Sequence, residues 1–538
     1  MQGQMMHRPL RVIDILSYAA EVHNTAEVVS VRVEGDMHRY TYRDALARVT
    51  QLASGLEKLG VQMGDRVATL AWNGYRHFEL YYAVAGIGAV CHTINPRLSA
   101  EQMIYIVNHA GDRVFFTDLT FVPALEKLAA HFPKDITFVI MTDRDHMPET
   151  TLNAHCYEEV LATGAPDYTF PDFDENTACA LCYTSGTTGN PKGALYSHRS
   201  TVLHAMMGGY SFQTCLSPGK RIMPVVPLFH VNAWGLPYAA PMTGASIVFP
   251  GPKLDGPSVW KLMEEECVFS AWGVPTVWLG LMQEIAAQGR KPSSFGEVII
   301  GGSAAPRSMI AGFEGMDVSV VHAWGMTEMS PIGTMGALYA PHTGLPKEEQ
   351  IDLKSKQGRR TFGVELKIVD ENGAPLPHDG TAAGELFVRG NTIVSGYFEN
   401  EEATAKALDS DGWFGTGDVA KIDPDGFLTL TDRAKDLIKS GGEWISSIDV
   451  ENLAMAHDHV ANCAVIAVPD EKWDERPLLV AIPAVESADK GAILTHLGDT
   501  LAKWQVPDDV VFVEELPMTA TGKVSKLTLR QMHADGRL

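Results

Sequence analysis

The chain has 538 residues, more than one typical domain, so two or more domains are expected. Hydrophobic residues make up 45% of it and charged residues 20%, which predicts a large buried core and excludes a disordered chain. The formal net charge of −23 argues against a nucleic-acid partner, whose binding surface is basic, but is compatible with a locally positive pocket for a small anion.

The N-terminal part of the chain has the pattern of an α/β protein. Charged residues interrupt the first fifteen positions, which therefore lack the apolar core of a signal peptide. Thr41 is the expected N-cap of a helix with apolar residues at helical spacing, and Gly60 is its stop signal. A strand over 66–72, a helix over 77–87 and a strand over 89–94 follow. This alternation predicts a parallel sheet with helices on both faces.

A loop rich in glycine and hydroxyl groups follows the apolar run 178–183, which we expect to be a buried strand. Glycine allows backbone N–H groups to turn toward an anion, Ser and Thr add donors, and Lys192 adds a positive charge. The spacing differs from that of the P-loop, which has two glycines five apart before its lysine. Loops rich in Ser, Gly and Thr are also typical of flexible turns, so the residues alone leave two interpretations open, a turn or a phosphate-binding loop of another kind. The loop residues are Thr184, Ser185, Gly186, Thr187, Thr188, Gly189 and Lys192.

The cysteines and the longest uncharged run indicate a cytoplasmic protein. Seven cysteines in a chain of this size favour a reducing compartment over a disulfide framework. Cys179 and Cys182 form a CxxC pair, but residues three apart on a strand point to opposite faces, which favours core packing over metal binding. Residues 222–252 carry no charge but include six prolines, so we expect no membrane insertion.

Two later strands, over 298–300 and 318–321, each run into a polar loop that contains glycine. Ligands of open α/β sheets bind beyond the carboxyl ends of the strands, so these loops should meet the phosphate loop in one crevice. Glu328 ends the second loop, and Mg²⁺ prefers one or two carboxylates together with phosphate oxygens and water. An isolated glutamate in a loop is usually only solvated, so Glu328 is a metal candidate only if the residues around it bind a nucleotide.

From about residue 365 the sequence pattern changes to that of short strands with alternating apolar and polar residues, which predicts a small antiparallel subdomain. A final segment of about 100 residues has its own strand, over 464–468, and its own helix, over 492–503. We place a domain boundary before it, which gives a large domain, 1–434, and a small C-terminal α+β domain, 435–538.

Five motifs follow one another along the chain. They are 183–193, Trp324-Gly325-Met326-Thr327-Glu328, Thr416-Gly417-Asp418, Asp432-Arg433-Ala434-Lys435-Asp436 and Pro517-Met518-Thr519-Ala520-Thr521-Gly522-Lys523. In sequence and in order they resemble the motifs of the adenylate-forming superfamily of acyl-CoA synthetases, peptide-synthetase adenylation domains and luciferases. Two residues depart from the commoner pattern of that superfamily, because Trp324 stands where relatives more often have Tyr and Arg360 stands where Pro is expected.

The resemblance implies an α/β large domain of parallel-type sheets with a small antiparallel subdomain, followed by a mobile C-terminal domain. Asp418 would bind the ribose hydroxyls, Arg433 would contact the nucleotide, and Lys435 would be the pivot of the mobile domain. Lys523 would be the catalytic lysine, whose ammonium can bridge the acid's carboxylate and the α-phosphate. Adenine would be bound by Trp324, Gly325, Met326 and Thr327. Further nucleotide contacts would come from Gly302, Ser303 and Ala304, and Mg²⁺ would be held at Thr184 and Glu328.

The segment 227–235 resembles the aromatic gate beside the acyl pocket of that superfamily. His230 is therefore a candidate catalytic and pocket residue, although a single histidine in an apolar stretch is also typical of a protein core. Trp234 and Gly302 are the other predicted walls of the pocket.

The resemblance further implies an ATP-dependent ligase that uses Mg²⁺ and coenzyme A. A small carboxylic acid would form acyl-AMP and pyrophosphate, the C-terminal domain would rotate, and the coenzyme A thiol would take the acyl group. The thioester side would be lined by Lys439, Ser440, Gly441, Gly442, Glu443 and Trp444. Family resemblance also favours a homodimer.

The whole sequence resembles the 3-methylmercaptopropionate–CoA ligases of marine bacteria, which act in dimethylsulfoniopropionate catabolism. A short- or medium-chain fatty acid would fit much the same pocket. Two other classes are considered, an adenylation enzyme that loads a carrier protein and a non-catalytic nucleotide-binding protein. We expect no carrier domain after Lys523, and a nucleotide-binding protein would need neither Lys523 nor the hinge motif.

Overall fold

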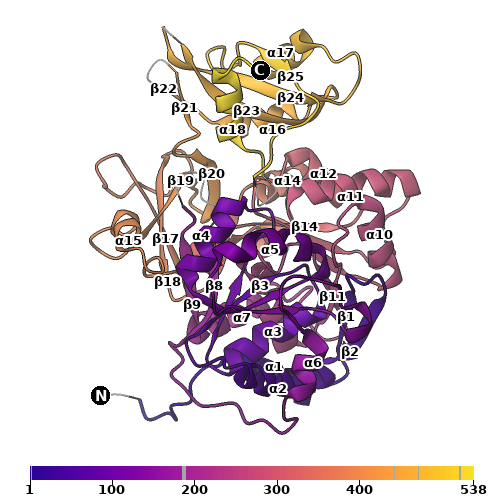
Figure 1. Ribbon diagram of the computed structural model, residues 1–538. Helices are drawn as coiled ribbons and strands as arrows, with labels where there is room; N and C mark the ends of the chain where they lie inside the picture. Colours follow the sequence, from indigo (N-terminus) through magenta and orange to yellow (C-terminus); the bar gives the residue numbers. More distant parts are fainter. Residues whose placement is uncertain (2, 185–189, 441–442, 471, 520–522) are drawn as a thin grey trace.

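The computed structural model describes residues 1, 3–184, 190–440, 443–470, 472–519 and 523–538. Its described strands form three sheets, and helices fill the space between and around them (Figure 1). The α/β architecture with a small antiparallel part, predicted from the sequence, is confirmed.

The first sheet contains, among the described residues, seven strands that are parallel except at one edge. At that edge β9 runs antiparallel to β8, so the chain returns along the same sheet after the predicted phosphate loop. In spatial order the strands are β7 (His155–Cys156), β6 (Thr137–Ile140), β5 (Asp112–Thr117), β3 (Arg66–Leu70), β4 (Val90–Thr93), β8 (Ala178–Tyr183) and β9 (Gly193–Ser197).

The second sheet continues from a parallel part into the antiparallel subdomain. Its parallel part, with antiparallel β2 at the edge, consists of β2 (Met37–Thr41), β1 (Glu27–Val31), β11 (Ser246–Phe249), β10 (Arg221–Pro224), β12 (Ser270–Gly273), β13 (Glu297–Ile300) and β14 (Ser319–Gly325). Its antiparallel part consists of β15 (Ile332–Met335), β16 (Gly358–Arg360), β20 (Phe427–Arg433), β19 (Phe414–Ile422), β18 (Gly384–Gly390) and β17 (Val364–Val369).

The largest apolar core joins both sheets to the helices packed between them. Thr41 caps the second of these helices, where its side chain and that of Asp44 form the reciprocal hydrogen bonds of a capping box. The helices are α1 (Val12–Val22), α2 (Tyr42–Lys58), α3 (Tyr75–Gly86), α6 (Tyr157–Thr163), α7 (His198–Ser211) and α9 (Leu236–Thr243).

Other helices cover the outer faces of the two sheets (Figure 1). α4 (Ala100–Ala110) and α5 (Val122–Leu128) cover the first sheet. The second sheet is covered by α10 (Gly256–Glu265), α11 (Pro275–Gln288), α12 (Arg307–Gly315) and α14 (Lys347–Ser355).

The C-terminal part has a separate sheet with helices on both faces. β20 ends at Arg433 in the large sheet, and the next strand, β21, belongs to the C-terminal sheet. The domain division at 434 stays a prediction. The elements are β21 (Ile438–Ser440), β22 (Glu443–Ile445), α16 (Ser447–Ala454), β23 (Val460–Asp470), β24 (Asp474–Pro483), α17 (Lys490–Gly498), β25 (Val510–Phe512) and α18 (Lys526–Ala534).

Two local predictions are wrong. The strand predicted over 318–321 continues through Gly325, because pairing with β15 extends it into the predicted loop. The helix predicted over 492–503 ends at Gly498.

The cysteine and membrane interpretations are consistent with the structure. Cys179 and Cys182 are both buried in the core. Residues 222–252 form two strands and two short helices, and none of the helices described here is long and apolar enough to cross a membrane.

Candidate functional site

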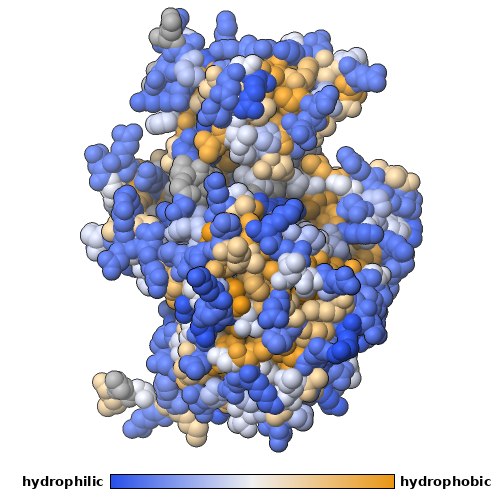
Figure 2. Space-filling view, viewed as in Figure 1, coloured by the Kyte–Doolittle hydropathy of each residue, from blue (hydrophilic) through white to orange (hydrophobic). Residues whose placement is uncertain are grey.

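A cavity of about 700 Å³ lies where the C-terminal part meets the large body of the chain. In Figure 2 the surface narrows between the C-terminal part at the top and the rest of the molecule. Most of the described site residues predicted from the sequence line this one cavity. They are Thr184, Lys192, His230, Trp234, Gly302, Ser303, Ala304, Trp324, Gly325, Met326, Thr327, Glu328, Asp418, Arg433, Lys435 and Lys523.

Asp418 is held from two sides. The Trp324 indole N–H donates to Oδ2 at 3.0 Å, and the Arg433 guanidinium pairs with Oδ1 at 2.7 Å. Asp418 is buried while Arg433 is exposed. Burial raises the pKa of the Asp418 carboxyl, and the charge of Arg433 opposes that rise. The pair places an acceptor for ligand hydroxyls beside a flat indole face.

Glu328 is a buried carboxylate in the segment 324–328, which begins at the end of β14 and which we call the Trp324 loop. The Tyr397 hydroxyl donates to its Oε1 at 2.6 Å, and the Lys192 ammonium lies 4.9 Å from the centre of the Tyr397 ring. Burial raises the pKa of Glu328. Tyr196 fixes the same loop by donating to the carbonyl oxygen of Thr327 at 2.5 Å. This part of the cavity therefore presents one carboxylate and one ammonium close to a common tyrosine.

The donor set fits a Mg²⁺ ion that is bound together with phosphate. Glu328, oriented by Tyr397, would supply a carboxylate oxygen to the metal, and Thr184 would supply a hydroxyl oxygen. In the part of the chain that the structure describes, no group of three or more His, Cys, Asp or Glu side chains is arranged to hold a metal. A single carboxylate is enough for Mg²⁺ when phosphate oxygens and water supply the remaining ligands.

Lys523 reaches the cavity from the C-terminal part. Burial and then the charge of Arg433 lower the pKa of its ammonium to about 8, against the opposing charge of Asp418. His230 lies on the facing wall, where burial and then the charge of Lys523 lower the pKa of the imidazole to about 4. At pH 7 the cavity therefore holds a protonated Lys523 and a neutral His230.

The segment after His230 has an unusual backbone. The four residues of α8 (Val231–Trp234) all have φ between 48° and 57°, the left-handed region. For residues other than glycine this conformation costs roughly 1–2 kcal/mol each, so the surroundings must enforce it. The turn directs the Trp234 ring over the loop at Gly301, where a Cβ would lie 3.1 Å from Cη2 of Trp234. The predicted wall residue is thus packed directly against a glycine at which a side chain would make tight contacts.

Several predicted residues do not reach the cavity lining. Ser440 is buried in the C-terminal sheet, where it accepts a hydrogen bond from Arg476 at 3.1 Å. Trp444 is half exposed, with the Lys439 ammonium 5.9 Å from its ring, and Glu443 is exposed beside it. The predictions for Ser185, Gly186, Thr187, Thr188, Gly189, Gly441 and Gly442 lie outside the described residues.

Tyr397 and Tyr196 were not among the predicted site residues. Tyr397 lies 69 positions from its partner Glu328, in a stretch without regular strand or helix periodicity. Tyr196 occupies a buried position of β9, where an aromatic residue is typical of a strand. In both cases only the tertiary structure reveals that the hydroxyl supports the Trp324 loop.

Two family models match the chain. The model described as AMP-binding enzyme matches residues 17–398, and that described as AMP-binding enzyme C-terminal domain matches residues 449–523.

Relatives match over nearly the full length. A 3-methylmercaptopropionyl-CoA ligase of Ruegeria lacuscaerulensis is 50% identical, with 99% of both chains covered. A medium-chain-fatty-acid–CoA ligase of Ectopseudomonas oleovorans is 49% identical, with 99% of this chain and 98% of that protein covered. The crystal structure of the anthranilate CoA ligase AuaEII in complex with anthranoyl-AMP superimposes with a TM-score of 0.87 at 23% identity over 99% of each chain, which shows a shared fold.

Proposed function

The chain belongs to the AMP-binding enzyme family and is an acid–CoA ligase of the AMP-forming type, and from this premise we propose that its acid is 3-methylmercaptopropionate. One observation carries the assignment of roles within the site. Lys523, the Trp324–Asp418 pair and an apolar wall all line a single cavity. A nucleotide and a small acid bound there would meet at the lysine.

In the first half-reaction an oxygen of the acid's carboxylate attacks the α-phosphorus of ATP. A P–O bond forms, the bond to the bridging oxygen breaks, and acyl-AMP and pyrophosphate result. The Lys523 ammonium and Lys192 offset the negative charge that develops on the phosphates, which is the kind of stabilisation that contributes most in water-excluded sites. A bound Mg²⁺ would neutralise phosphate charge from the side of Glu328.

The nucleoside would lie against Trp324, with its ribose hydroxyls donating to Asp418. Glu328 and Tyr397 fix the far end of the same loop. We assign His230 to the acid side, where a neutral imidazole can donate a hydrogen bond to the carboxylate without adding charge.

In the second half-reaction the thiol sulfur of coenzyme A attacks the acyl carbon. A C–S bond forms, the C–O bond to AMP breaks, and the thiol proton is lost to solvent. Four residues predicted to line the site of this step are not part of the cavity lining. They are Lys439, Ser440, Glu443 and Trp444. We therefore propose that the C-terminal domain reorients about Lys435, which lies on the cavity just beyond the end of β20.

The acid end of the cavity is apolar. Its lining includes Phe212, Val231, Trp234, Trp272, Leu279 and Ile299. A thioether acid is small, apolar and unbranched, so it suits such a wall, and the 50% identical relative is named for that acid. A medium-chain fatty acid is the second candidate, because it has the same chemistry and gives its name to the 49% identical relative.

Coenzyme A-dependent AMP release with a panel of acids tests the assignment. The panel is acetate, propionate, butyrate, hexanoate, octanoate, benzoate and 3-methylmercaptopropionate. We expect the highest kcat/KM for 3-methylmercaptopropionate. Butyrate and hexanoate, whose chains are of similar length, are the acids with which its kcat/KM is compared. A higher value for a fatty acid would replace the substrate and keep the mechanism.

Two further parts of the proposal concern the metal ion and the oligomeric state. The metal role of Glu328 is tested by measuring whether pyrophosphate release stops after treatment with a chelator and returns when Mg²⁺ is added again. We also propose a homodimer, which sedimentation velocity of the purified chain would test.

A further inference from the structure

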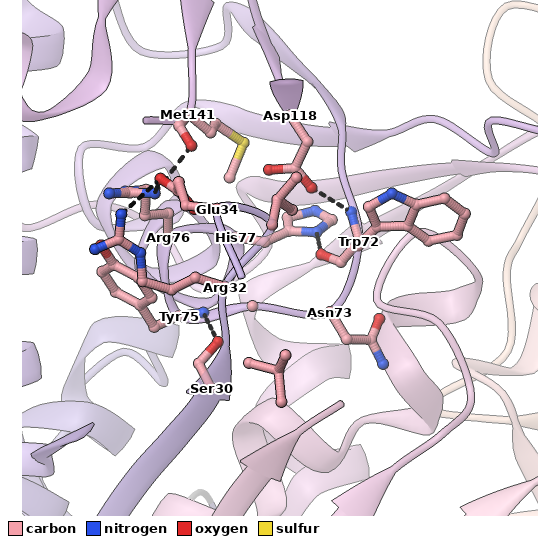
Figure 3. A pocket seen from close by; sticks show the side chains of 13 residues that line it. Ser30, Arg32, Glu34, Trp72, Asn73, Tyr75, Arg76, His77, Asp118 and Met141 are labelled. Atoms are coloured by element: carbon pink, nitrogen blue, oxygen red, sulfur yellow. Dashed lines mark hydrogen bonds and ion pairs between the residues drawn. The ribbon is translucent and has the colours of Figure 1, made fainter. Parts of the chain in front are cut away.

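Asn73 connects the two large sheets behind the acid side of the cavity. It follows β3 of the first sheet, is 4% exposed, and its backbone pairs with Gly251 just after β11 of the second sheet. Its side chain in Figure 3 points away from the ion-paired cluster of Arg32, Glu34 and Arg76.

The Asn73 amide uses both of its ends on one segment of backbone. Nδ2 donates to the carbonyl oxygens of Pro224 at 2.7 Å and Val226 at 2.9 Å, and Oδ1 accepts from the Leu228 N–H at 2.6 Å. One side chain thus satisfies three backbone groups of the segment 224–228. This segment carries no secondary structure of its own after β10 ends at Pro224.

The same segment leads directly into the left-handed turn Val231–Trp234. A strained turn of that kind persists only where the surrounding structure enforces it, and the segment 224–228 is part of those surroundings. Three other hydrogen bonds hold the same segment. The Tyr81 hydroxyl donates to the Leu228 carbonyl oxygen, and the N–H groups of Val225 and Val226 both donate to the Trp272 carbonyl oxygen. Of these side chains, Asn73 supplies the most bonds, and it contributes no atom to the lining of the cavity.

We propose that Asn73 is a positioning residue for the acid pocket, acting through 224–228 on the left-handed turn that presents His230 and Trp234. This inference rests on the proposed function, in which those two residues face the acid. Nothing in it requires contact between Asn73 and a substrate.

The test compares Asn73→Ala with a matched control. Asn108→Ala removes an amide that also donates to two backbone carbonyl oxygens, those of Ile104 at 2.8 Å and His131 at 2.9 Å, but on α4 at a distance in sequence from the turn. The assay uses whichever acid of the panel the parent enzyme turns over best, so a wrong substrate assignment changes the acid and leaves the test intact.

We expect Asn73→Ala to raise the KM for the acid by about tenfold or more, while the KM for ATP stays within about twofold. Asn108→Ala should change neither constant by more than about twofold. Tyr81→Phe, which removes one hydroxyl from the same segment, should shift the acid KM in the same direction by a smaller factor and serves if Asn73→Ala does not fold.

A double variant separates positioning from general damage. If Asn73 acts through the turn, adding Asn73→Ala to Trp234→Ala should raise the acid KM by less than Asn73→Ala does alone. Full additivity of the two, equal increases in both KM values, or unchanged values in both Asn73→Ala and Tyr81→Phe would each overturn the inference. Failure of Trp234→Ala itself to alter acid use would instead count against the proposed pocket.

Discussion

The Trp324 indole N–H donates to Oδ2 of Asp418, and the two residues come from strands 94 positions apart in the sequence. A tryptophan N–H is a donor only, so the bond orients the Asp418 carboxylate. Its two oxygens, one bonded to Trp324 and the other to Arg433, each keep a lone pair for a ligand. The residue expected to contact adenine therefore also orients the residue expected to contact ribose.

We predict that Trp324→Phe weakens recognition of the ribose. Phenylalanine keeps an aromatic face but has no N–H, so Asp418 loses a bond to a charged acceptor, which is worth about 1.5–3 kcal/mol in proteins. The KM for ATP should rise by about tenfold, and the preference for ATP over 2′-deoxy-ATP should fall. Trp260→Phe is the control, since it removes an indole bond to the Arg290 carbonyl oxygen outside the cavity. Unchanged discrimination between the two nucleotides would contradict the prediction.

Lys523→Ala should slow the first half-reaction by about 10²–10³-fold, the usual effect of removing one donor that stabilises developing charge. Affinity for ATP, measured by calorimetry, should change little. The readout is acid-dependent pyrophosphate release in the absence of coenzyme A. Lys490→Ala is the matched control, because this lysine of the same domain pairs with Asp509 at an exposed position. Pyrophosphate release equal to that of the parent would exclude Lys523 from the chemistry.

The pH dependence of that step should report the lowered pKa of Lys523. The ammonium is the active form, so with a pKa of about 8 it is protonated below pH 8 and lost above it. We expect kcat/KM for pyrophosphate release to fall about tenfold per pH unit above pH 8. Omitting coenzyme A keeps the titration of its thiol out of the profile. Lys523→Arg should lack this descending limb whatever its residual rate, and a parent profile that stays flat to pH 9.5 would contradict the assignment.

Ser447 forms a contact across the predicted domain boundary. Its N–H and its hydroxyl both donate to Oδ2 of the buried Asp432, at 2.7 and 2.5 Å. If the C-terminal domain turns about Lys435, this contact must break, because its two partners lie on opposite sides of that residue.

Ser447→Ala should therefore slow pyrophosphate release by about three- to tenfold and affect thioester formation from preformed acyl-AMP less. Asp489→Ala provides the comparison, since its carboxylate caps α17 within the C-terminal domain and crosses no boundary. An equal loss in both half-reactions would indicate a role in stability alone.

Local sequence patterns predicted the elements that depend on interactions between residues close together in the sequence. The Thr41–Asp44 capping box follows from residue types three apart, and the apolar run before Thr184 follows from strand composition. The strand end at Gly325 could not be placed in this way, because pairing with β15 extends it.

The residues of the candidate site likewise fall into those that the sequence predicted and those that only the structure reveals. Motif resemblance identified Asp418 and Lys523, which do line one cavity. It did not reveal Tyr397 or Asn73, whose partners lie 69 and more than 150 positions away. The left-handed turn before Gly235 was also unpredictable, since four non-glycine residues with positive φ contradict their own intrinsic preferences and are held only by tertiary contacts.

The second sheet passes without interruption from β14 through β15, β16 and β20 to β19. The strands that carry Trp324, Arg433 and Asp418 are consequently members of one hydrogen-bonded framework. Excising residues 332–433 would leave β14 as a bare edge, prone to pair with other chains. The antiparallel subdomain is therefore not a transplantable module. The strands of the C-terminal part pair only with one another within the described chain, so replacing that part would leave every backbone pairing of the large sheet in place.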